Sequence, residues 1–185
     1  MKKIILGLAL SLTIVAGTPV KAGCIEREVV VGMSSKTVTF NKEDIRGSAK
    51  VTSEALRKVV PETMKEIVND IVYFSEVYGV NALAITGIIR QESGNNTSRL
   101  ANSKNNLGGI KFSTGEYRTF KSKTECIEYM VKLLKNNYLS PDGKYFNGYS
   151  LRDINKLYCP DDGYFWSKQV SIMATKMMND IKKLK

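Results

Sequence analysis

The apolar residues between positions 61 and 79 follow the spacing of one helix face. They recur at i, i+3, i+4 and i+7 intervals, which is typical of an amphipathic helix. These residues are Met64, Ile67, Val68, Ile71, Phe74 and Tyr78. Pro61 suits the first turn of such a helix, and Gly79 suits its C-terminal cap. The pattern therefore predicts a helix that begins near Pro61 and ends at Gly79.

A second helix is predicted from Ala82 to about Glu92, and it is apolar almost all round. Asn81 is suited to cap its N-terminus, and Gly94 is suited to end it. A helix without a polar face is normally buried in the middle of a domain. We therefore expect this segment to be the buried central helix of the fold.

A long polar segment follows the second helix. Residues 94–117 are rich in Asn, Ser and Gly, which predicts a loop with a minimal hairpin around Gly115. Ser122, with Glu125 three positions later, is typical of a capping box that opens a third helix.

Two more helices complete the pattern. Ser150 is expected to cap a short helix that ends at Tyr158, and a last helix carries Trp166 on its apolar side. The sequence therefore predicts a mainly α, single globular domain.

The first 22 residues have the pattern of a secretory signal peptide. Two lysines precede the apolar run from Ile4 to Val20, and Val20-Lys21-Ala22 resembles a small-residue cleavage site. An uncleaved anchor helix is the alternative, because the run is at the short limit for a membrane span. The end of a lipidation motif is also present before Cys24, although Lys21 stands where that motif has Leu.

These features divide the chain into three parts. We expect a signal peptide over residues 1–22, a partly ordered N-terminal arm over 23–53 and the folded domain over 54–185. The protein is then secreted or associated with the cell wall, and we expect it to be a monomer.

The charge of the chain is strongly positive. It carries 28 Lys and Arg against 18 Asp and Glu, a formal charge of +10, and removal of the signal peptide with its three lysines leaves +7. A basic exported protein is attracted to anionic wall polymers or lipid head groups. Export argues against nucleic acid as a partner for the basic and aromatic C-terminal third. Membrane contact is expected only through the signal segment or a lipidated Cys24.

The chain contains no histidine and only three cysteines. These counts exclude a Ser-His-Asp or Cys-His nucleophile, an HExxH zinc site and a four-thiolate zinc site. Nothing in the sequence calls for a metal or an organic cofactor. Acid–base chemistry therefore falls to Asp, Glu, Tyr or Lys.

Glu92 is the candidate acid, because it continues the side of the buried helix that carries Ile88 and Ile89. Burial and the negative end of the helix dipole are both expected to raise the pKa of Glu92, which suits a general acid. The alternative is a surface glutamate on a frayed last turn.

The residues around Glu92 belong to an ordered set of motifs that resembles the bacterial cell-wall glucosaminidase family, glycoside hydrolase family 73. The resemblance covers about 140 of the 163 residues that follow the predicted signal peptide. Its main motifs are Tyr78-Gly79-Val80-Asn81, Arg90-Gln91-Glu92-Ser93-Gly94, Asn105-Asn106-Leu107-Gly108-Gly109-Ile110-Lys111, Tyr117-Arg118-Thr119-Phe120 and Tyr158-Cys159-Pro160-Asp161. It implies a lysozyme-like α+β domain with a minimal β-hairpin, in which the central helix ends in the catalytic glutamate.

The resemblance also implies roles for individual residues. Glu92 matches the acid that protonates the glycosidic oxygen of peptidoglycan, and Tyr158 matches a tyrosine of the substrate cleft. Asn106 and Gly109 would belong to a loop that lines a sugar subsite, and Tyr117 would stack on a sugar ring.

The second carboxylate is not evident. Glycosidases usually use two carboxylates, about 5–5.5 Å apart for retention and about 6.5–9.5 Å apart for inversion. Glu116 is the only acid in the shortened hairpin and is our candidate, with a solvated turn residue as the alternative. Glu125 is also near the family's spacing, but its capping role explains it without catalysis. A single-acid mechanism assisted by the N-acetyl group of the substrate remains open.

Cys126 and Cys159 are candidates for a disulfide, which would stabilise the fold by roughly 3–4 kcal/mol. Two reduced thiols are the alternative. Cys24 would then be the odd cysteine.

The sequence thus predicts a secreted peptidoglycan hydrolase, most simply an endo-β-N-acetylglucosaminidase that uses Glu92. A lytic transglycosylase or a muramidase on the same fold, and a catalytically inactive wall-binding protein, are the alternatives.

Overall fold

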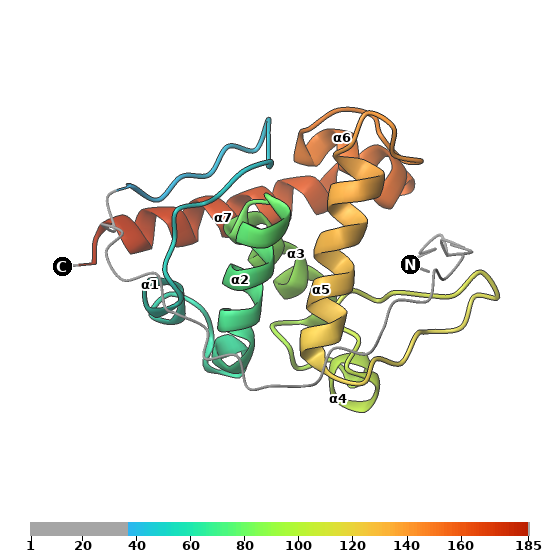
Figure 1. Ribbon diagram of the computed structural model, residues 1–185, viewed down its shortest axis with the longest axis horizontal. Helices are drawn as coiled ribbons and strands as arrows, with labels where there is room; N and C mark the ends of the chain where they lie inside the picture. The colour runs from blue at the N-terminus through green and yellow to red at the C-terminus, as the bar shows by residue number, and fades with distance from the viewer. Residues whose placement is uncertain (1–36, 185) are drawn as a thin grey trace, which may run out of the picture.

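The computed structural model describes residues 37–184, and it confirms a mainly α domain (Figure 1). The predicted signal peptide, residues 23–36 of the predicted arm, and Cys24 lie outside the described residues. The helical elements in chain order are α1 (Ser53–Arg57), the 3-10 helix η2 (Glu62–Ile67), α2 (Val68–Tyr78), α3 (Ala82–Ser93), α4 (Arg99–Lys104), α5 (Lys123–Leu133), the π-helical turn η3 (Leu134–Tyr138), α6 (Leu151–Tyr158), the 3-10 turn η4 (Pro160–Asp162) and α7 (Phe165–Lys182).

Helix α3 is the central element, as the sequence predicts. Nine of its residues are buried, from Ala82 to Ser93. Its N-terminus is fixed by Asn81, whose side-chain oxygen accepts hydrogen bonds from the N–H groups of Leu83 and Ala84 at 3.1 and 3.3 Å. In Figure 1, α3 lies behind α2 and α5, and it also packs against the long α7. Its C-terminal end is therefore held by packing on several sides.

Helices α3 and α7 approach each other closely at Gly87. A Cβ atom at this position would lie 3.1 Å from the backbone oxygen of Val170 and 3.2 Å from its Cγ1. These distances are shorter than ordinary van der Waals contact, so the absence of a side chain at Gly87 permits this approach. Val170 itself is fully buried. The glycine thereby sets the position of the N-terminal half of α7 beside the end of α3.

The helix predicted from Pro61 is broken into two parts, η2 and α2. The backbone oxygen of Thr63 accepts a hydrogen bond from Nδ2 of Asn96 at 2.6 Å, and the Thr63 hydroxyl donates to the backbone oxygen of Asn95 at 2.7 Å. These contacts tie the first turn to the segment after α3 and compete with regular α-helical pairing at Thr63. The apolar stripe is retained: Met64 and Ile67 are buried in η2.

The segment 94–117 contains a helix that the sequence pattern did not reveal. Helix α4 begins after Ser98, whose hydroxyl accepts from the N–H of Ala101 at 3.2 Å. The predicted minimal hairpin is present at residues 111–117, with a single antiparallel bridge between Lys111 and Tyr117. Gly115 at its tip has φ +89°. The long segment thus consists of a polar turn, a short helix and a small hairpin.

The predicted arm is partly built into the domain. Four of its side chains are buried within the hydrophobic core: Val38, Ile45, Ala49 and Val51. The N–H of Asn81 donates to the backbone oxygen of Ile45 at 2.8 Å, which attaches this segment to the start of α3. Residues 37–53 therefore support the central helix.

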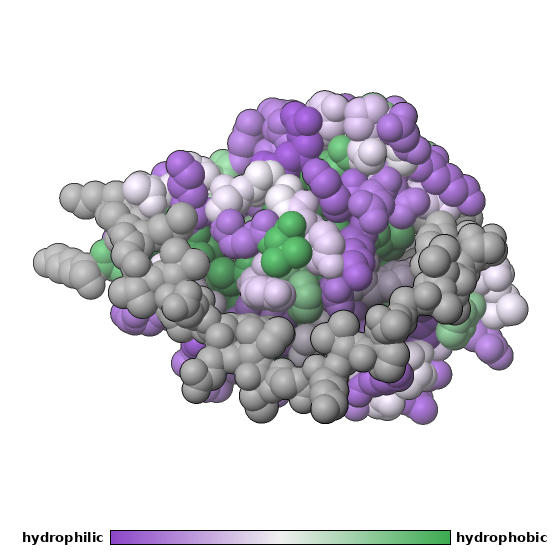
Figure 2. Space-filling model, viewed as in Figure 1, coloured by the Kyte–Doolittle hydropathy of each residue, from purple (hydrophilic) through white to green (hydrophobic). Residues whose placement is uncertain are grey.

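Within residues 37–184, no helix combines the length and the apolar character that a membrane crossing requires. The face viewed in Figure 2 is mostly hydrophilic over the described residues, and hydrophobic side chains form only small exposed groups.

Candidate active site

Glu92 lies in the last turn of α3, and its side chain is half-buried. Its Oε1 accepts a hydrogen bond from the indole Nε1 of Trp166 at 2.7 Å. Trp166 is 3% exposed and lies in the first turn of α7. The carboxyl group is therefore held against the start of the last helix, and the alternative of a frayed surface glutamate does not apply.

Tyr158, at the end of α6, completes an aromatic wall beside the carboxyl group. The centroids of its ring and the Trp166 indole are 4.8 Å apart. Its hydroxyl donates to the backbone oxygen of Gly108 at 3.3 Å. Burial raises the pKa of Tyr158 well above its usual value, and the nearby charge of Glu92 raises it further. The phenol therefore stays protonated and keeps its role as a donor to the loop.

An apolar pocket lies against the rings of Tyr158 and Trp166, so water solvates this aromatic wall poorly. It is lined by Ile88, Ile110, Met130, Leu133, Leu134, Tyr138, Tyr158 and Trp166. The residues that the sequence places far apart, on α3, the 106–110 loop, α6 and α7, thus meet at one place.

The loop at 106–110 is held by Asn106, which is 1% exposed. Its Nδ2 donates to the backbone oxygens of Ile110 and Arg118 at 2.8 and 2.9 Å, and its Oδ1 accepts from the N–H of Ile110 at 2.9 Å. Both amide protons and the oxygen are engaged within the protein. Asn106 thereby positions the loop and the hairpin, and the sugar subsite that this loop would line stays a prediction.

Gly109 has a structural reason to be glycine. Its φ is +62°, in the left-handed region that favours glycine, and the residue is buried. At neighbouring Gly108, a Cβ would lie 2.9 Å from the Sδ of Met130. The two glycines let the loop turn closely over α5 and present the Gly108 carbonyl to Tyr158.

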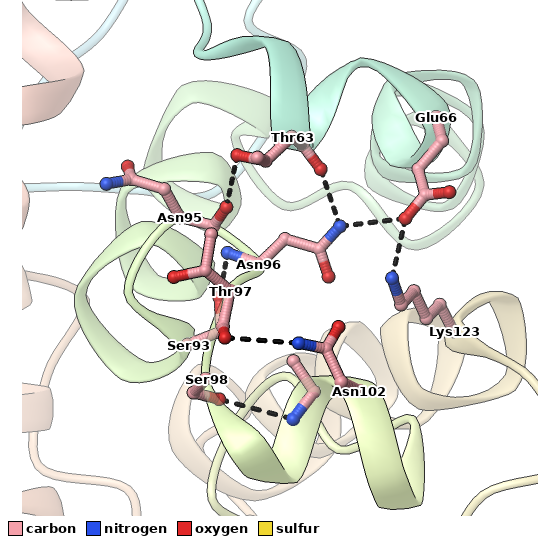
Figure 3. Close-up of polar contacts among 10 residues, drawn as sticks. Thr63, Glu66, Ser93, Asn95, Asn96, Thr97, Ser98, Asn102 and Lys123 are labelled. Atoms are coloured by element: carbon pink, nitrogen blue, oxygen red, sulfur yellow. Dashed lines mark hydrogen bonds and ion pairs between the residues drawn. The ribbon is translucent and has the colours of Figure 1, made fainter.

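The turn after Glu92 is stabilised by a network of polar contacts (Figure 3). Gly94, Asn95 and Asn96 all have φ near +60°. The Ser93 hydroxyl donates to the backbone oxygen of Ile89 at 2.6 Å and accepts from the N–H of Asn96 at 2.8 Å. Three consecutive left-handed residues are rare, and such strain persists only where the surroundings support it.

Asn96 connects this turn to two other elements. Its Nδ2 donates to the backbone oxygen of Thr63 and to Oε1 of Glu66 at 2.9 Å, and Lys123 pairs with the same Glu66 oxygen at 2.6 Å (Figure 3). The hydrogen bonds from Lys123 and Asn96 lower the pKa of Glu66. Elements η2 and α5 thereby fix the chain directly after Glu92.

The hairpin residues do not join the cluster around Glu92. Glu116 is exposed, and its backbone oxygen accepts from the N–H of Phe112 at 2.8 Å. Tyr117 is half-buried, and the Nζ of Lys111 lies 4.8 Å from its ring centroid. Neither side chain contacts Glu92 in the part of the chain that the structure describes. Their catalytic and sugar-stacking roles stay predictions.

Glu125 acts as a helix cap. Its N–H donates to the Ser122 hydroxyl at 3.1 Å, and its Oε2 accepts from the N–H of Lys121 at 2.6 Å. The return contact reaches Lys121 rather than Ser122, so the box is displaced by one residue. The carboxylate is engaged at the start of α5, in agreement with the capping interpretation.

The expected disulfide between Cys126 and Cys159 is not formed, because both residues carry thiols in the structure. The Cys126 sulfur instead accepts a hydrogen bond from the N–H of Leu107 at 3.3 Å. Burial raises the pKa of Cys126 to about 11. The Cys126 thiol therefore supports the 106–110 loop rather than a bond to Cys159.

Trp166 is the residue of this cluster that sequence analysis missed. It was assigned only to the apolar side of the last helix. A signal was available: a buried tryptophan usually has an acceptor for its N–H, and Trp166 is the one tryptophan of the chain.

One family model matches residues 68–178, and its description is mannosyl-glycoprotein endo-beta-N-acetylglucosaminidase. The match covers more than half of the chain. The chain belongs to this glucosaminidase family. Membership makes it a glycoside hydrolase by family, and the matched region contains Glu92, Tyr158 and Trp166. No curated protein matches the chain.

Solved structures of autolysins have the same fold as this glucosaminidase. A catalytic mutant of S. aureus autolysin E in complex with the disaccharide NAG-NAM has a TM-score of 0.59 and 16% identity, over 78% of this chain and 75% of that one. The same autolysin in complex with the muropeptide NAM-L-Ala-D-iGlu has a TM-score of 0.60 and 18% identity, over the same shares of the two chains. The catalytic domain of the autolysin Auto from Listeria monocytogenes has a TM-score of 0.51 and 15% identity, over 68% of this chain and 87% of that one.

Proposed function

We propose that this glucosaminidase cleaves the glycan strands of peptidoglycan at an N-acetylglucosaminyl bond, with Glu92 as the general acid. The observation that carries the proposal is the place of Glu92, which ends the buried helix and lies against the aromatic wall of Tyr158 and Trp166. Autolysin E, which has the same fold, is in complex with NAG-NAM in one structure and with a muropeptide in another, which supports a peptidoglycan substrate.

The proposed step transfers the proton of Glu92 to the glycosidic oxygen. The bond between this oxygen and the anomeric carbon breaks, its electron pair stays on the oxygen, and the released chain carries a new hydroxyl group. One water molecule then adds to the anomeric carbon and gives up a proton, which restores the acid. The reaction consumes one water for each bond and needs no cofactor.

Glu116 is our candidate for the group that activates this water. It lies on the hairpin whose base is fixed by Asn106, and its exposed carboxylate is available to a bound strand. Assistance by the N-acetyl group of the substrate is the alternative.

A lytic transglycosylase is the second candidate function. One observation favours it: Glu125 is engaged in capping α5, and a transglycosylase needs no second carboxylate because it uses one glutamate first as acid and then as base. Its product is a 1,6-anhydro sugar rather than a reducing end. A muramidase leaves a reducing end, as a glucosaminidase does, but on N-acetylmuramic acid instead of N-acetylglucosamine.

The site of action follows from the same proposal. Peptidoglycan is outside the cytoplasmic membrane, so the protein must be exported, and the pattern of residues 1–22 is the feature that supports this. We propose that it is secreted or retained at the wall, where its positive charge favours anionic wall polymers.

Clearing of a suspension of purified peptidoglycan tests the proposal. We expect Glu92→Gln to lower the rate by about 10²–10⁴-fold, which is the usual contribution of a general acid. Glu54→Gln is the matched control, because Glu54 is exposed and paired only with Lys58 on α1. If Glu92→Gln clears and binds peptidoglycan like the parent, the enzymatic proposal is wrong. If the parent also binds without clearing, the protein is an inactive wall-binding protein.

Glu116→Gln distinguishes activation of the water by the Glu116 carboxylate from assistance by the N-acetyl group of the substrate. A loss of about 10²-fold or more identifies Glu116 as the base. A rate near that of the parent contradicts this role and favours assistance by the substrate.

A further inference from the structure

Trp166 contacts Glu92 through a group that can only donate. The indole Nε1–H is a donor without acceptor capacity, and it lies 2.7 Å from Oε1 of Glu92. An oxygen that accepts this hydrogen bond cannot at the same time direct its own proton toward the indole. The contact therefore makes the two oxygens of the Glu92 carboxyl group chemically different.

We propose that Trp166 is a positioning residue that keeps Oε1 of Glu92 as the acceptor, so that Oε2 carries the acid proton. The inference rests on the proposed function of Glu92 as general acid. It goes further by assigning the proton to one oxygen and by naming the residue that makes the choice.

The contact also favours the proton transfer itself. When the proton leaves Oε2 for the glycosidic oxygen, the carboxyl group becomes negatively charged. The hydrogen bond from Trp166 to Oε1 is then charge-assisted and stronger. An interaction that strengthens as charge develops stabilises the transition state more than the ground state. Trp166 thus acts through Glu92, without touching the substrate.

Trp166 is itself held by polar groups on both sides of η4. Oδ2 of Asp162 accepts from the backbone N–H of Trp166 at 2.8 Å, and Oδ1 accepts from Nδ2 of Asn155 at 2.8 Å and from the N–H of Tyr164 at 3.0 Å. Asn155 is 1% exposed, and its Oδ1 accepts from the N–H of Ser167 at 2.8 Å. Asp162 and Asn155 therefore anchor the first turn of α7 to α6.

The titratable groups near the pair do not disturb this assignment. Tyr158 on α6 is the titratable group next to Glu92. Three further titratable groups lie near Tyr158: Cys159, Tyr138 on η3 and Cys126 on α5. Burial raises the pKa values of Tyr158, Tyr138 and Cys126, so all three stay neutral while a carboxylic acid titrates. These three groups therefore do not account for a pH-dependent indole signal in the acidic range, and Glu92→Gln tests whether that signal comes from Glu92 rather than from Asp162, which contacts the backbone N–H of Trp166.

Trp166→Phe tests the inference by kinetics, because it removes the N–H and keeps an aromatic ring. We expect kcat to fall on the order of 10²-fold, with KM nearly unchanged because the buried Trp166 does not line the substrate. The alkaline limb of the kcat/KM profile should move to higher pH, because a donor that favours charged Glu92 is lost. An unchanged kcat and pH profile would overturn the inference.

Comparison with Glu92→Gln keeps the two proposals distinct. If Glu92→Gln abolishes activity and Trp166→Phe does not change it, the acid is correct and the positioning role is wrong. If neither variant changes activity, the proposed function itself is wrong.

A second measurement does not depend on the folding of a Trp166 variant. The chain has one tryptophan, so an NMR spectrum of the 15N-labelled protein contains a single indole signal. We expect its shift to follow one acidic titration in the parent and to be independent of pH in Glu92→Gln. A flat signal in the parent, over the range where activity titrates, would contradict the contact.

Two neighbouring aspartates provide a matched test of the anchor. The Asp162 carboxylate accepts hydrogen bonds from three N–H groups, so Asp162→Asn places an amide NH2 against one of these donors. We expect this variant to displace the indole signal and to lower kcat. Asp161 is exposed, and its side chain has no hydrogen-bond partner within residues 37–184. Asp161→Asn should leave both readouts unchanged. Equal effects of the two variants would overturn the role of Asp162.

Discussion

Several polar side chains beside Glu92 serve to hold backbone in place. Asn106 uses every donor and acceptor of its amide to close the 106–110 loop. Asn96 joins the left-handed turn after Glu92 to η2. The Cys126 thiol accepts from Leu107 in the floor of the same loop. At the scale of single residues, the site is a carboxyl group and its aromatic neighbours inside a rigid polar frame.

The reactivity of Cys126 follows from this placement. Only thiolate reacts with alkylating agents, and a pKa of about 11 leaves roughly a thousandth of the thiol ionised at about pH 8. We expect iodoacetamide to leave Cys126 unmodified in the folded protein and to modify it fully after unfolding in urea. Peptide mass spectrometry measures both states. Rapid alkylation of Cys126 in the folded protein would show that the loop is open.

The places of residues were partly predictable from the sequence. The half-buried position of Glu92 follows from the periodicity of its helix, which fixes the side on which it lies. The hydrogen bonds of Asn106 were not predictable, because a motif does not tell whether an amide faces the substrate or the backbone. The hydrogen bond between Trp166 and Glu92 spans 74 positions in sequence, and local patterns carry no information on such a contact.

At the scale of elements, helix ends set the geometry of the site. Asn81 caps the start of α3, and Gly94 at φ +59° ends it one residue after its last turn. Caps and apolar stripes are local signals, so α3, α5, α6 and α7 were predicted well. The 3-10 geometry of η2 and the short helix α4 were missed, since the first involves a contact of Thr63 with a distant asparagine and the second is too short for a periodic pattern.

The capping box of α6 gives a stability prediction with a defined pH dependence. Burial alone would raise the pKa of Asp153, but hydrogen bonds from Ser150 and the ion pair with Lys156 outweigh it and lower the pKa below 3.8. The stabilisation is therefore present above the unfolded-state pKa and is lost as pH falls through the folded-state value.

We expect Ser150→Ala to lower the free energy of unfolding by about 1 kcal/mol near pH 7, and by less at an acidic pH, as the pH falls through the lowered pKa of Asp153. Urea unfolding at the two pH values measures the difference. Ser113→Ala, in the exposed hairpin, is the control and should be neutral. An equal loss at both pH values would show that Asp153 does not take part.

At the scale of the whole molecule, a basic surface accompanies a site for a neutral sugar bond. Two cations on α6 and α7, Arg152 and Lys168, form no ion pair with a carboxylate of residues 37–184, and both line a broad surface groove with Tyr164. Unpaired cations of this kind increase the attraction of the protein to anionic polymers.

This charge predicts wall binding that depends on salt. Glu92→Gln, which separates binding from cleavage, should bind walls that retain their anionic polymers more tightly than walls stripped of them. The difference should disappear between about 0.05 M and about 0.5 M salt, because the Debye length falls below the spacing of the charges. Sedimentation with intact and stripped walls measures it. Equal binding to both at low salt would contradict a role for charge.

The proposed function specifies the bond that the protein cuts and the carboxyl group that acts as the acid. The most direct measurement is mass spectrometry of the products from purified peptidoglycan, for the parent and for Glu92→Gln. We predict reducing N-acetylglucosamine ends from the parent and none from Glu92→Gln. Anhydro ends from the parent, or reducing ends from Glu92→Gln at the rate of the parent, would contradict this prediction.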